Sequence, residues 1–208
     1  MKTNIAVLVS GGGTNLQALI DAQARGELGG GEIAAVISSK AGAYALERAA
    51  KAGIPGYVIP RKEFDSNRAM TVALVEKLRE LSIDLVVLAG CMVIFTEELV
   101  QAYPNAIMNV HPALIPSFCG EGYYGLHVHE KAIAYGVKLS GATVHFVTEE
   151  CDGGPIIAQQ AVPVLPGDTP EVLQQRIMEQ AEWKLLPEAV KLFCEDKITV
   201  DGRTVIIH

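Results

Sequence analysis

Short apolar runs rich in β-branched residues alternate with helical stretches through the first half of the chain. Each run is only a few residues long, which is typical of a buried strand rather than a helix. The predicted strands are residues 5–9, 33–38, 57–59, 85–88 and 107–111, and the predicted helices are residues 15–24, 43–52, 67–81 and 96–102. Strand, helix and strand in succession form right-handed crossovers. The sequence therefore predicts an α/β fold, a doubly wound, mostly parallel sheet with helices on both faces.

The second half of the chain has a different texture. Residues 112–125 contain two prolines and two adjacent tyrosines and are too irregular for a helix or strand, and such long loops usually cover a site. The elements predicted after this loop are strands at 139–147 and 156–164, a long amphipathic helix at 170–193, and a C-terminal hairpin of strands 198–200 and 204–207. With 208 residues in all, we expect one domain, 1–208.

The charge and composition of the chain argue against several classes of partner. The formal net charge is −7 and no Lys/Arg cluster reverses it locally, so we expect no nucleic-acid and no membrane partner. No run of about 18 apolar residues is present to span a bilayer, and residues 1–9 lack the sections of a secretion signal. Four cysteines without CxxC pairing fit free thiols in a reducing compartment. We therefore expect a cytoplasmic protein that binds small molecules.

Three successive glycines follow the first predicted strand, in the segment Ser-Gly-Gly-Gly-Thr-Asn at residues 10–15. Glycines let an oxygen approach the backbone, and the helix that follows supplies N–H groups and partial positive charge, so the loop favours a phosphate. No Gly-Lys-Ser/Thr follows, and Leu16 stands where a dinucleotide loop has its third glycine, so nucleotide cofactors are not favoured. A tight turn capped by Thr or Asn is the simpler alternative. The residues expected to hold the phosphate are Gly12, Gly13, Thr14 and Asn15.

Asn109 and His111 lie two residues apart on a predicted strand, so their side chains face the same way at its carboxyl end, the edge at which open α/β sheets bind ligands. An amide stabilises a developing oxyanion, and an imidazole exchanges a proton near neutral pH. Asp152, in the turn Cys-Asp-Gly-Gly-Pro, is expected to fold back over the sheet and raise the pKa of His111. The alternatives are a polar pair that only ties down the next loop and an ordinary turn aspartate.

Six motifs follow one another along nearly the whole chain. They are Ser10-Gly11-Gly12-Gly13-Thr14-Asn15-Leu16-Gln17, Leu88-Ala89-Gly90, Asn109-Val110-His111-Pro112, Leu114-Ile115-Pro116, Gly125-Leu126-His127-Val128-His129 and Asp152-Gly153-Gly154-Pro155. Together they resemble the phosphoribosylglycinamide formyltransferases of purine synthesis. Asn-x-His-Pro and Asp-Gly-Gly-Pro alone match any folate-dependent formyltransferase, and the glycine loop decides among them. The resemblance implies a formyltransferase-like Rossmann variant with a phosphate-binding half, 1–104, and a catalytic and folate-binding half, 105–208.

The resemblance implies transfer of the formyl group of the co-substrate 10-formyltetrahydrofolate to the amine of 5-phosphoribosylglycinamide, with no metal. The amide of Asn109 and protonated His111 would hold the oxyanion, while Asp152 would sustain the imidazolium and move a proton through water. The substrate phosphate would bind the glycine loop. Glu182 resembles the family's glutamate near the ribose and glycinamide, the alternative being a solvated helix charge. A monomer or homodimer is expected.

The same resemblance puts the folate pterin against the segment after the fourth strand and the turn before Asp152. The folate-binding residues implied are Arg68, Met92, Val93, Ile94, Phe95, Asn109 and Glu149. Many relatives carry arginine where this chain has Val93 and Asn67, so the chain departs from the family where the glutamate tail of folate would bind. Loop 117–124 is expected to be a mobile lid or a static surface insertion.

Other interpretations stay open beside this one. Formyltetrahydrofolate deformylases use a similar Asn, His and Asp set but usually carry an extra N-terminal domain, whereas this chain is expected to begin at its first strand. Methionyl-tRNA formyltransferases need a further C-terminal domain and a basic surface. A non-catalytic phosphosugar-binding module would leave Asn109 and His111 without a role. A zinc site of His111, His127 and His129 is disfavoured because nearby acids lack ligand spacing, and His145 is expected in the core or near the site.

Overall fold

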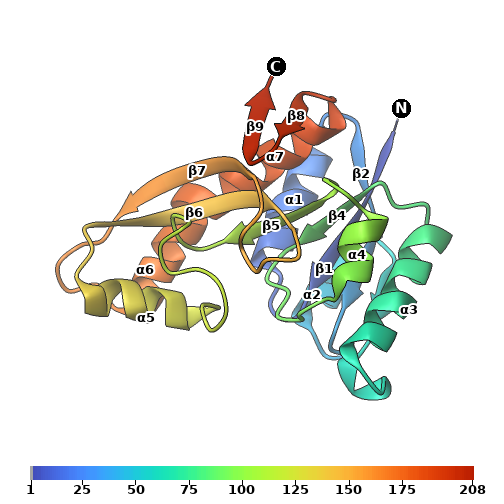
Figure 1. The fold of residues 1–208 in the computed structure, drawn as a ribbon, viewed down its shortest axis with the longest axis horizontal. Helices are drawn as coiled ribbons and strands as arrows, with labels where there is room; N and C mark the ends of the chain where they lie inside the picture. Colours follow the sequence, from blue (N-terminus) through green and yellow to red (C-terminus); the bar gives the residue numbers. More distant parts are fainter. Residues whose placement is uncertain (1) are drawn as a thin grey trace.

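A seven-stranded sheet in the order β3-β2-β1-β4-β5-β6-β7 forms the centre of the computed structural model, which describes residues 2–208 (Figure 1). The strands are β1 (Thr3–Val9), β2 (Gly31–Ser38), β3 (Gly56–Val58), β4 (Leu85–Leu88), β5 (Ile107–His111), β6 (Leu139–Phe146) and β7 (Ile156–Pro163). The first five pair in parallel, whereas β6 and β7 extend the sheet in antiparallel fashion. The predicted doubly wound, mostly parallel sheet is confirmed.

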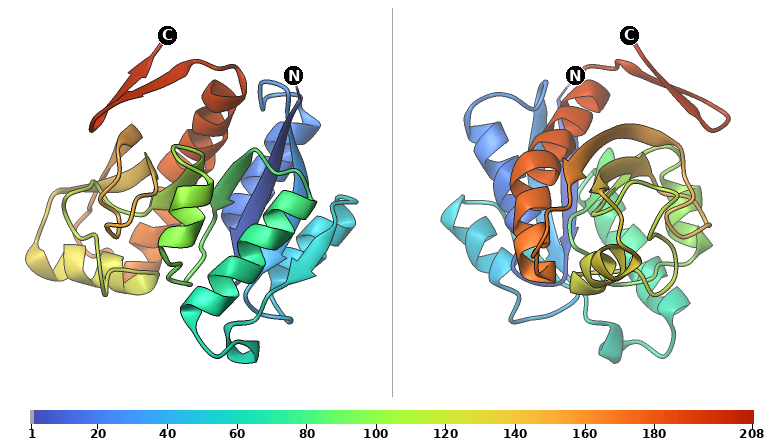
Figure 2. Two further views of the ribbon diagram at one scale, coloured as in Figure 1. Left: turned by 45° about the vertical axis from the view of Figure 1, so that its right-hand side comes forward. Right: turned by 90° about the vertical axis from the view of Figure 1, so that its left-hand side faces the viewer.

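Helices cover both faces of this sheet (Figures 1 and 2). They are α1 (Thr14–Ala24), α2 (Tyr44–Lys51), a 3₁₀ turn (Arg61–Glu63), α3 (Asn67–Glu80), α4 (Glu97–Ala102), α5 (Leu126–Tyr135), α6 (Pro170–Ile177), a π-helical segment (Met178–Glu182) and α7 (Trp183–Cys194). One hydrophobic core packs α1, α2 and α7 against one face, and a second packs α3 and α4 against the other. A smaller cluster joins α6 to the antiparallel strands.

The strand order reverses at β1, and this reversal determines where a ligand can bind. β2 and β3 lie on one side of β1, while β4 and β5 lie on the other. Every residue of β4 is buried, because helices cover both of its faces and leave no place for polar side chains within the strand. Polar groups therefore gather beyond the carboxyl ends of the strands, at the edge where open α/β sheets bind ligands.

Two helical segments differ from the prediction. The sequence does not predict α5, because Leu-His-Val-His alternates apolar and polar residues as a strand does, yet the residues buried in this helix are Val128, His129 and Ala132. The helix predicted at 170–193 is not one regular α-helix, since the π-helical segment separates α6 from α7. A π-helical turn shifts the register of the side chains that follow it and is frequent at functional sites.

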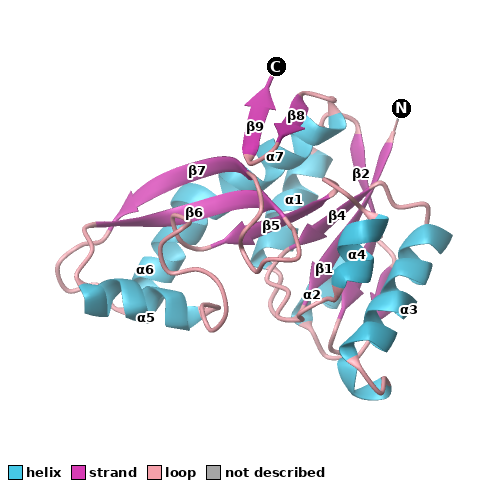
Figure 3. Cartoon of the chain, viewed as in Figure 1, coloured by secondary structure: helices cyan, strands magenta, loops and turns pink. Residues whose placement is uncertain are grey.

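A separate two-stranded hairpin, β8 (Ile198–Asp201) and β9 (Thr204–Ile207), follows α7. It stands apart from the large sheet near the end of α7, as Figures 2 and 3 show. Its residues Ile198, Val200 and Val205 pack against the edge of the first core. The predicted C-terminal hairpin is confirmed. Within residues 2–208, no helix is both long enough and apolar enough to cross a membrane.

Candidate active site

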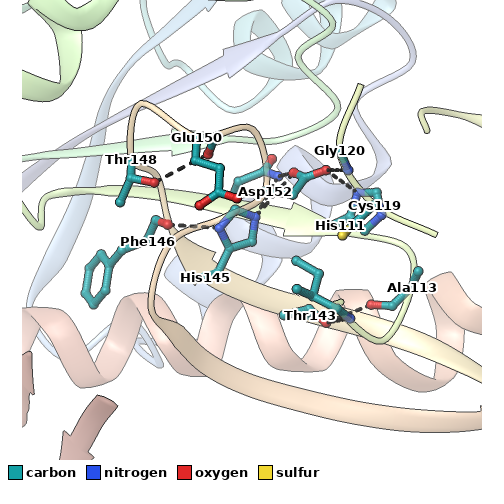
Figure 4. A network of polar contacts seen from close by, with 12 residues as sticks. His111, Ala113, Cys119, Gly120, Thr143, His145, Phe146, Thr148, Glu150 and Asp152 are labelled. Atoms are coloured by element: carbon teal, nitrogen blue, oxygen red, sulfur yellow. Dashed lines mark hydrogen bonds and ion pairs between the residues drawn. The ribbon is translucent and has the colours of Figure 1, made fainter. Parts of the chain in front are cut away.

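Asn109, His111 and Asp152 lie together at the carboxyl end of β5. Figure 4 shows His111 and Asp152 side by side. Oδ2 of Asp152 lies 3.5 Å from Nδ1 of His111, and its Oδ1 lies 3.4 Å from Nδ2 of Asn109. Asp152 arrives from the turn between β6 and β7, where its φ of 53° is in the left-handed region. The structure thus gathers the three side chains from two segments that are far apart in sequence.

His145 on β6 joins this group from the neighbouring strand. It pairs in register with Asn109, its ring is almost fully buried, and its Nε2 lies 3.2 Å from the Asn109 amide nitrogen and 3.5 Å from Oδ1 of Asp152. Its Nδ1 lies 2.9 Å from the carbonyl oxygen of Phe146, and this contact fixes the orientation of the ring. His145 thus contacts both Asn109 and Asp152, in agreement with its expected place near the site.

The pKa of His111 is lowered overall, although Asp152 acts on it in the expected direction. Burial lowers the pKa of this imidazole, and the opposing effects of the Asp152 carboxylate and the Phe118 carbonyl do not restore it to its ordinary value. Desolvation thus outweighs the ion pair. Burial alone would raise the pKa of the Asp152 carboxyl, but contacts with His145, His111 and the Gly120 N–H together lower it. Asp152 is thus a carboxylate at neutral pH.

The turn that carries Asp152 approaches the sheet so closely that it requires a glycine at residue 154. A Cβ on Gly154 would collide with the backbone carbonyl group of Phe146 in β6. The close approach lets the carboxylate reach over the end of β5. Gly154 is therefore explained by the position of the acid.

Loop 117–124 packs directly on the catalytic candidates. The carbonyl oxygen of Phe118 lies 2.8 Å from Nε2 of His111, and the N–H of Gly120 donates to Oδ2 of Asp152 at 2.9 Å. The Phe118 ring makes edge contacts with Tyr123 and with Tyr135 of α5, at centroid distances of 6.2 and 5.9 Å. The loop is therefore part of the site. These backbone contacts carry no sequence signature, so residue patterns alone do not reveal them.

The glycine loop enters α1 with Gly13 in a left-handed conformation, φ 71° and ψ 38°. No side chain caps this helix end, so the alternative of a turn capped by Thr or Asn is wrong. Asn15 is among the residues expected to hold the phosphate, but its side chain is directed elsewhere, because its Nδ2 donates to Oε2 of Glu182 at 2.6 Å. Backbone N–H groups at the start of α1 are therefore the donors this loop offers to an anion.

Glu182 lies in the π-helical segment and is buried, with 6% of its surface exposed. Burial raises the pKa of its carboxyl to about 7, against the lowering effect of the hydrogen bond from Asn15. The alternative of a solvated helix charge is therefore wrong. The Asn15–Glu182 contact joins the first turn of α1 to the last long helix and puts a titrating carboxyl beside the glycine loop.

The residues expected to bind folate do not all lie together. Met92 and Ile94 are 60% and 69% exposed, forming an apolar surface on the segment after β4. Val93 and Phe95 instead line a small cavity of about 20 Å³ beneath that segment. Arg68 is held on the surface by Glu98, with 2.5 Å between Nε and Oε1. Two more residues are expected to bind folate. Asn109 lies beside Asp152 in the active site, and Glu149 is exposed.

The histidines considered for zinc lie in different environments. Nδ1 of His127 is 3.0 Å from Oε2 of Glu130 on the exposed side of α5, while His129 on the same helix is fully buried. Burial, with a smaller effect of His111, lowers the pKa of His129 to about 4. Among residues 2–208, no group of three or more His, Cys, Asp and Glu side chains is arranged to hold a metal ion.

The open sheet, the glycine loop and the buried polar group at one edge define an enzyme of the α/β class. Residues 3–190 match the family model described as formyl transferase. The phosphoribosylglycinamide formyltransferase of Haemophilus influenzae is 45% identical over 194 residues, 93% of this chain and 88% of the relative. The chain belongs to the formyl transferase family, and within it to the phosphoribosylglycinamide formyltransferases.

Solved structures agree with this assignment. Glycinamide ribonucleotide transformylase 1 from Symbiobacterium toebii superposes with a TM-score of 0.93 at 45% identity, covering 99% of this chain and 94% of that one. A formyltetrahydrofolate deformylase from Pseudomonas syringae has a TM-score of 0.89 at 28% identity, and this chain covers 66% of its length. The fold is thus shared with a hydrolase, and the sequence is nearer to the transferases.

Proposed function

We propose that the chain transfers the formyl group of 10-formyltetrahydrofolate to the amine of 5-phosphoribosylglycinamide, with Asn109, His111 and Asp152 as its catalytic residues. The main support is the contact of one carboxylate with both the imidazole and the amide, each within 3.5 Å, at the ligand-binding edge of the sheet. These groups have the chemistry that an acyl transfer needs: two donors for an oxyanion and an acceptor for a proton.

In the proposed reaction the substrate amine attacks the formyl carbon, and the carbonyl oxygen becomes an oxyanion. Asn109 Nδ2 and a protonated His111 donate hydrogen bonds to it. The intermediate then collapses as the bond from the formyl carbon to N10 of the folate breaks. The amine loses one proton and N10 gains one, and a water held by the Asp152 carboxylate carries that proton. Asp152 also favours the imidazolium that burial opposes.

Loop 117–124 must move before His111 can donate a hydrogen bond to the oxyanion. Nε2 of His111 now faces the carbonyl oxygen of Phe118. A substrate oxyanion at that nitrogen would have to displace the carbonyl, so we infer that folate binding moves the loop. This supports the interpretation of the loop as a lid rather than a static insertion.

The two substrates would occupy opposite sides of this group. The phosphate would bind the backbone N–H groups at Gly13, Thr14 and Asn15. Glu182, which contacts Asn15, would contact the ribose or glycinamide. The pterin would cover the exposed apolar side chains of Met92 and Ile94. Removal of that surface from water favours a flat aromatic ligand there.

One assay tests the proposal against both alternatives. Tetrahydrofolate release from 10-formyltetrahydrofolate is followed with and without 5-phosphoribosylglycinamide. Release that depends on the amine supports the transferase. Release at the same rate without the amine would identify a deformylase, and no release under either condition would favour a phosphosugar-binding module.

A further inference from the structure

The glycine loop rests on α2, and one cation of that helix is built into it. We propose that Arg48 is a positioning residue for the phosphate of the substrate: it fixes the carbonyl groups of the loop away from the anion and supplies positive charge behind it. This inference rests on the proposed function, because it concerns how the same loop selects a phosphate-bearing substrate.

Two consecutive carbonyl groups of the loop are bound by α2. The N–H of Ala45, in the first turn of α2, donates to the carbonyl oxygen of Gly11 at 3.1 Å. Nε of Arg48, one turn later, donates to the carbonyl oxygen of Gly12 at 2.8 Å. A carbonyl oxygen pointing at a phosphate would repel it. Because both oxygens are turned toward α2, the N–H groups at the start of α1 stay free for the anion.

The glycine loop approaches α2 closely at Gly13, the N-cap residue of α1. A Cβ on Gly13 would lie 2.6 Å from Cβ and 2.9 Å from Cα of Ala45, and 3.6 Å from Cδ of Arg48. The left-handed conformation of Gly13 is therefore moulded against α2. A change at Arg48 is transmitted to the loop through this contact and the Gly12 hydrogen bond.

The guanidinium is held on three sides. Besides Nε, its Nη1 donates to Oε1 of Gln17 in α1 at 2.9 Å, and its carbon lies 5.0 Å from the centre of the Tyr44 ring. A planar guanidinium that makes two hydrogen bonds and lies over an aromatic ring cannot be replaced in full by the ammonium group of lysine. Arg48 thus links α1, α2 and the loop between them in one rigid unit.

The positive charge of Arg48 is expected to attract the phosphate as well as to position the loop. A phosphate monoester carries nearly two negative charges at neutral pH, and the carboxyl of Glu182 lies close behind the loop through Asn15. Within residues 2–208, Arg48 is the only cationic side chain that hydrogen-bonds to residues 10–17. In a chain of net charge −7, it is the local charge that makes the loop attractive to an anion.

Arg48→Gln and Arg48→Lys, compared with Lys51→Gln, test this inference. Lys51 is a matched control because its ammonium lies 5.5 Å from the same Tyr44 ring on the same helix. Steady-state kinetics give kcat and the KM of each substrate, and calorimetric titration with inorganic phosphate gives a dissociation constant that needs no turnover.

Arg48→Gln is expected to raise the KM of phosphoribosylglycinamide and the dissociation constant of phosphate by about tenfold, as for loss of a charged hydrogen-bonding group. The KM of folate and the free energy of unfolding should change little by comparison. Arg48→Lys should restore part of the phosphate affinity because it restores the charge, and Lys51→Gln should match the wild type.

An unchanged dissociation constant for phosphate in Arg48→Gln would overturn the inference. So would an equal rise in both KM values with a loss of stability, since this would show a merely structural role. Failure of the proposed function is a separate result, seen in the wild type as turnover that does not depend on phosphoribosylglycinamide. The phosphate titrations still decide the role of Arg48 in that case.

Discussion

Glu182→Gln is expected to stabilise the fold above neutral pH while weakening substrate binding. The carboxyl is 6% exposed and its pKa is raised by burial from 4.5 to about 7. Each tenfold change in proton affinity corresponds to about 1.4 kcal/mol, so ionisation of this group opposes folding by about 3 kcal/mol once the pH is well above 7. Glutamine removes the charge, and its side-chain oxygen still accepts the hydrogen bond from Asn15.

The sign of this effect follows from the direction of the pKa change. The folded state binds the proton of Glu182 more tightly than the unfolded state does. The contribution of the group to stability is therefore fully present below about pH 4.5 and is lost as the pH rises to about 7. Relative to the wild type, the glutamine variant should gain nothing near pH 4.5 and about 3 kcal/mol near pH 8.

Urea unfolding of the wild type and the variant at several values between pH 4.5 and 8.5 measures this difference. Glu179→Gln is the control, because Glu179 is exposed in the same π-helical segment. Curves of unfolding free energy that run parallel across the whole range would refute the reasoning, since the carboxyl would then titrate alike in both states. A raised KM for phosphoribosylglycinamide in Glu182→Gln would show that the carboxyl destabilises the fold but is needed for substrate binding.

Three further substitutions have distinct expected outcomes. Asn109→Ala should lower kcat by about two to three orders of magnitude with little change in either KM, because it removes an oxyanion donor; a loss confined to KM would contradict that role. Gly13→Ala should lower the free energy of unfolding in urea by about 2 to 5 kcal/mol, because the strain of a left-handed alanine adds to the overlap with Ala45. Gly136→Ala should lower it by only about 1 to 2 kcal/mol, because its φ is also positive, at 83°, but no atom lies within 4 Å of the added Cβ. Equal losses in the two variants would disprove the overlap. Ser66→Ala should cost about 1 kcal/mol by removing the cap on α3, and an unaltered unfolding midpoint would speak against the cap.

The fold was largely predictable because its signals are local. Buried strands such as β4 show as uninterrupted apolar runs, and the C-terminal hairpin shows as two short apolar segments around a glycine, although its turn is Gly202-Arg203 because Asp201 pairs with Thr204. α5 escapes prediction because its alternating Leu-His-Val-His start has the period of a strand, and only burial against neighbouring segments selects a helix.

The candidate site was predictable only in part, because its contacts join distant parts of the sequence. Asn109 and His111 share a strand, and the strand period alone turns them the same way. The contact of Asp152 with Asn109 spans 43 residues and that of Arg48 with Gly12 spans 36. No pattern within either segment encodes such a distance, which the sheet order determines. The net pKa of His111 likewise depends on burial, a property of the assembled fold.

The contacts of loop 117–124 supply hydrogen-bonding partners to the polar groups of the site. A peptide carbonyl at the imidazole and a peptide N–H at the carboxylate are partners of the kind that a reactant would provide. If folate displaces this loop as proposed, it replaces one set of hydrogen-bonding partners with another. Its affinity is then the difference between two sets of contacts, and the protein sets one of them through the aromatic contacts that anchor Phe118.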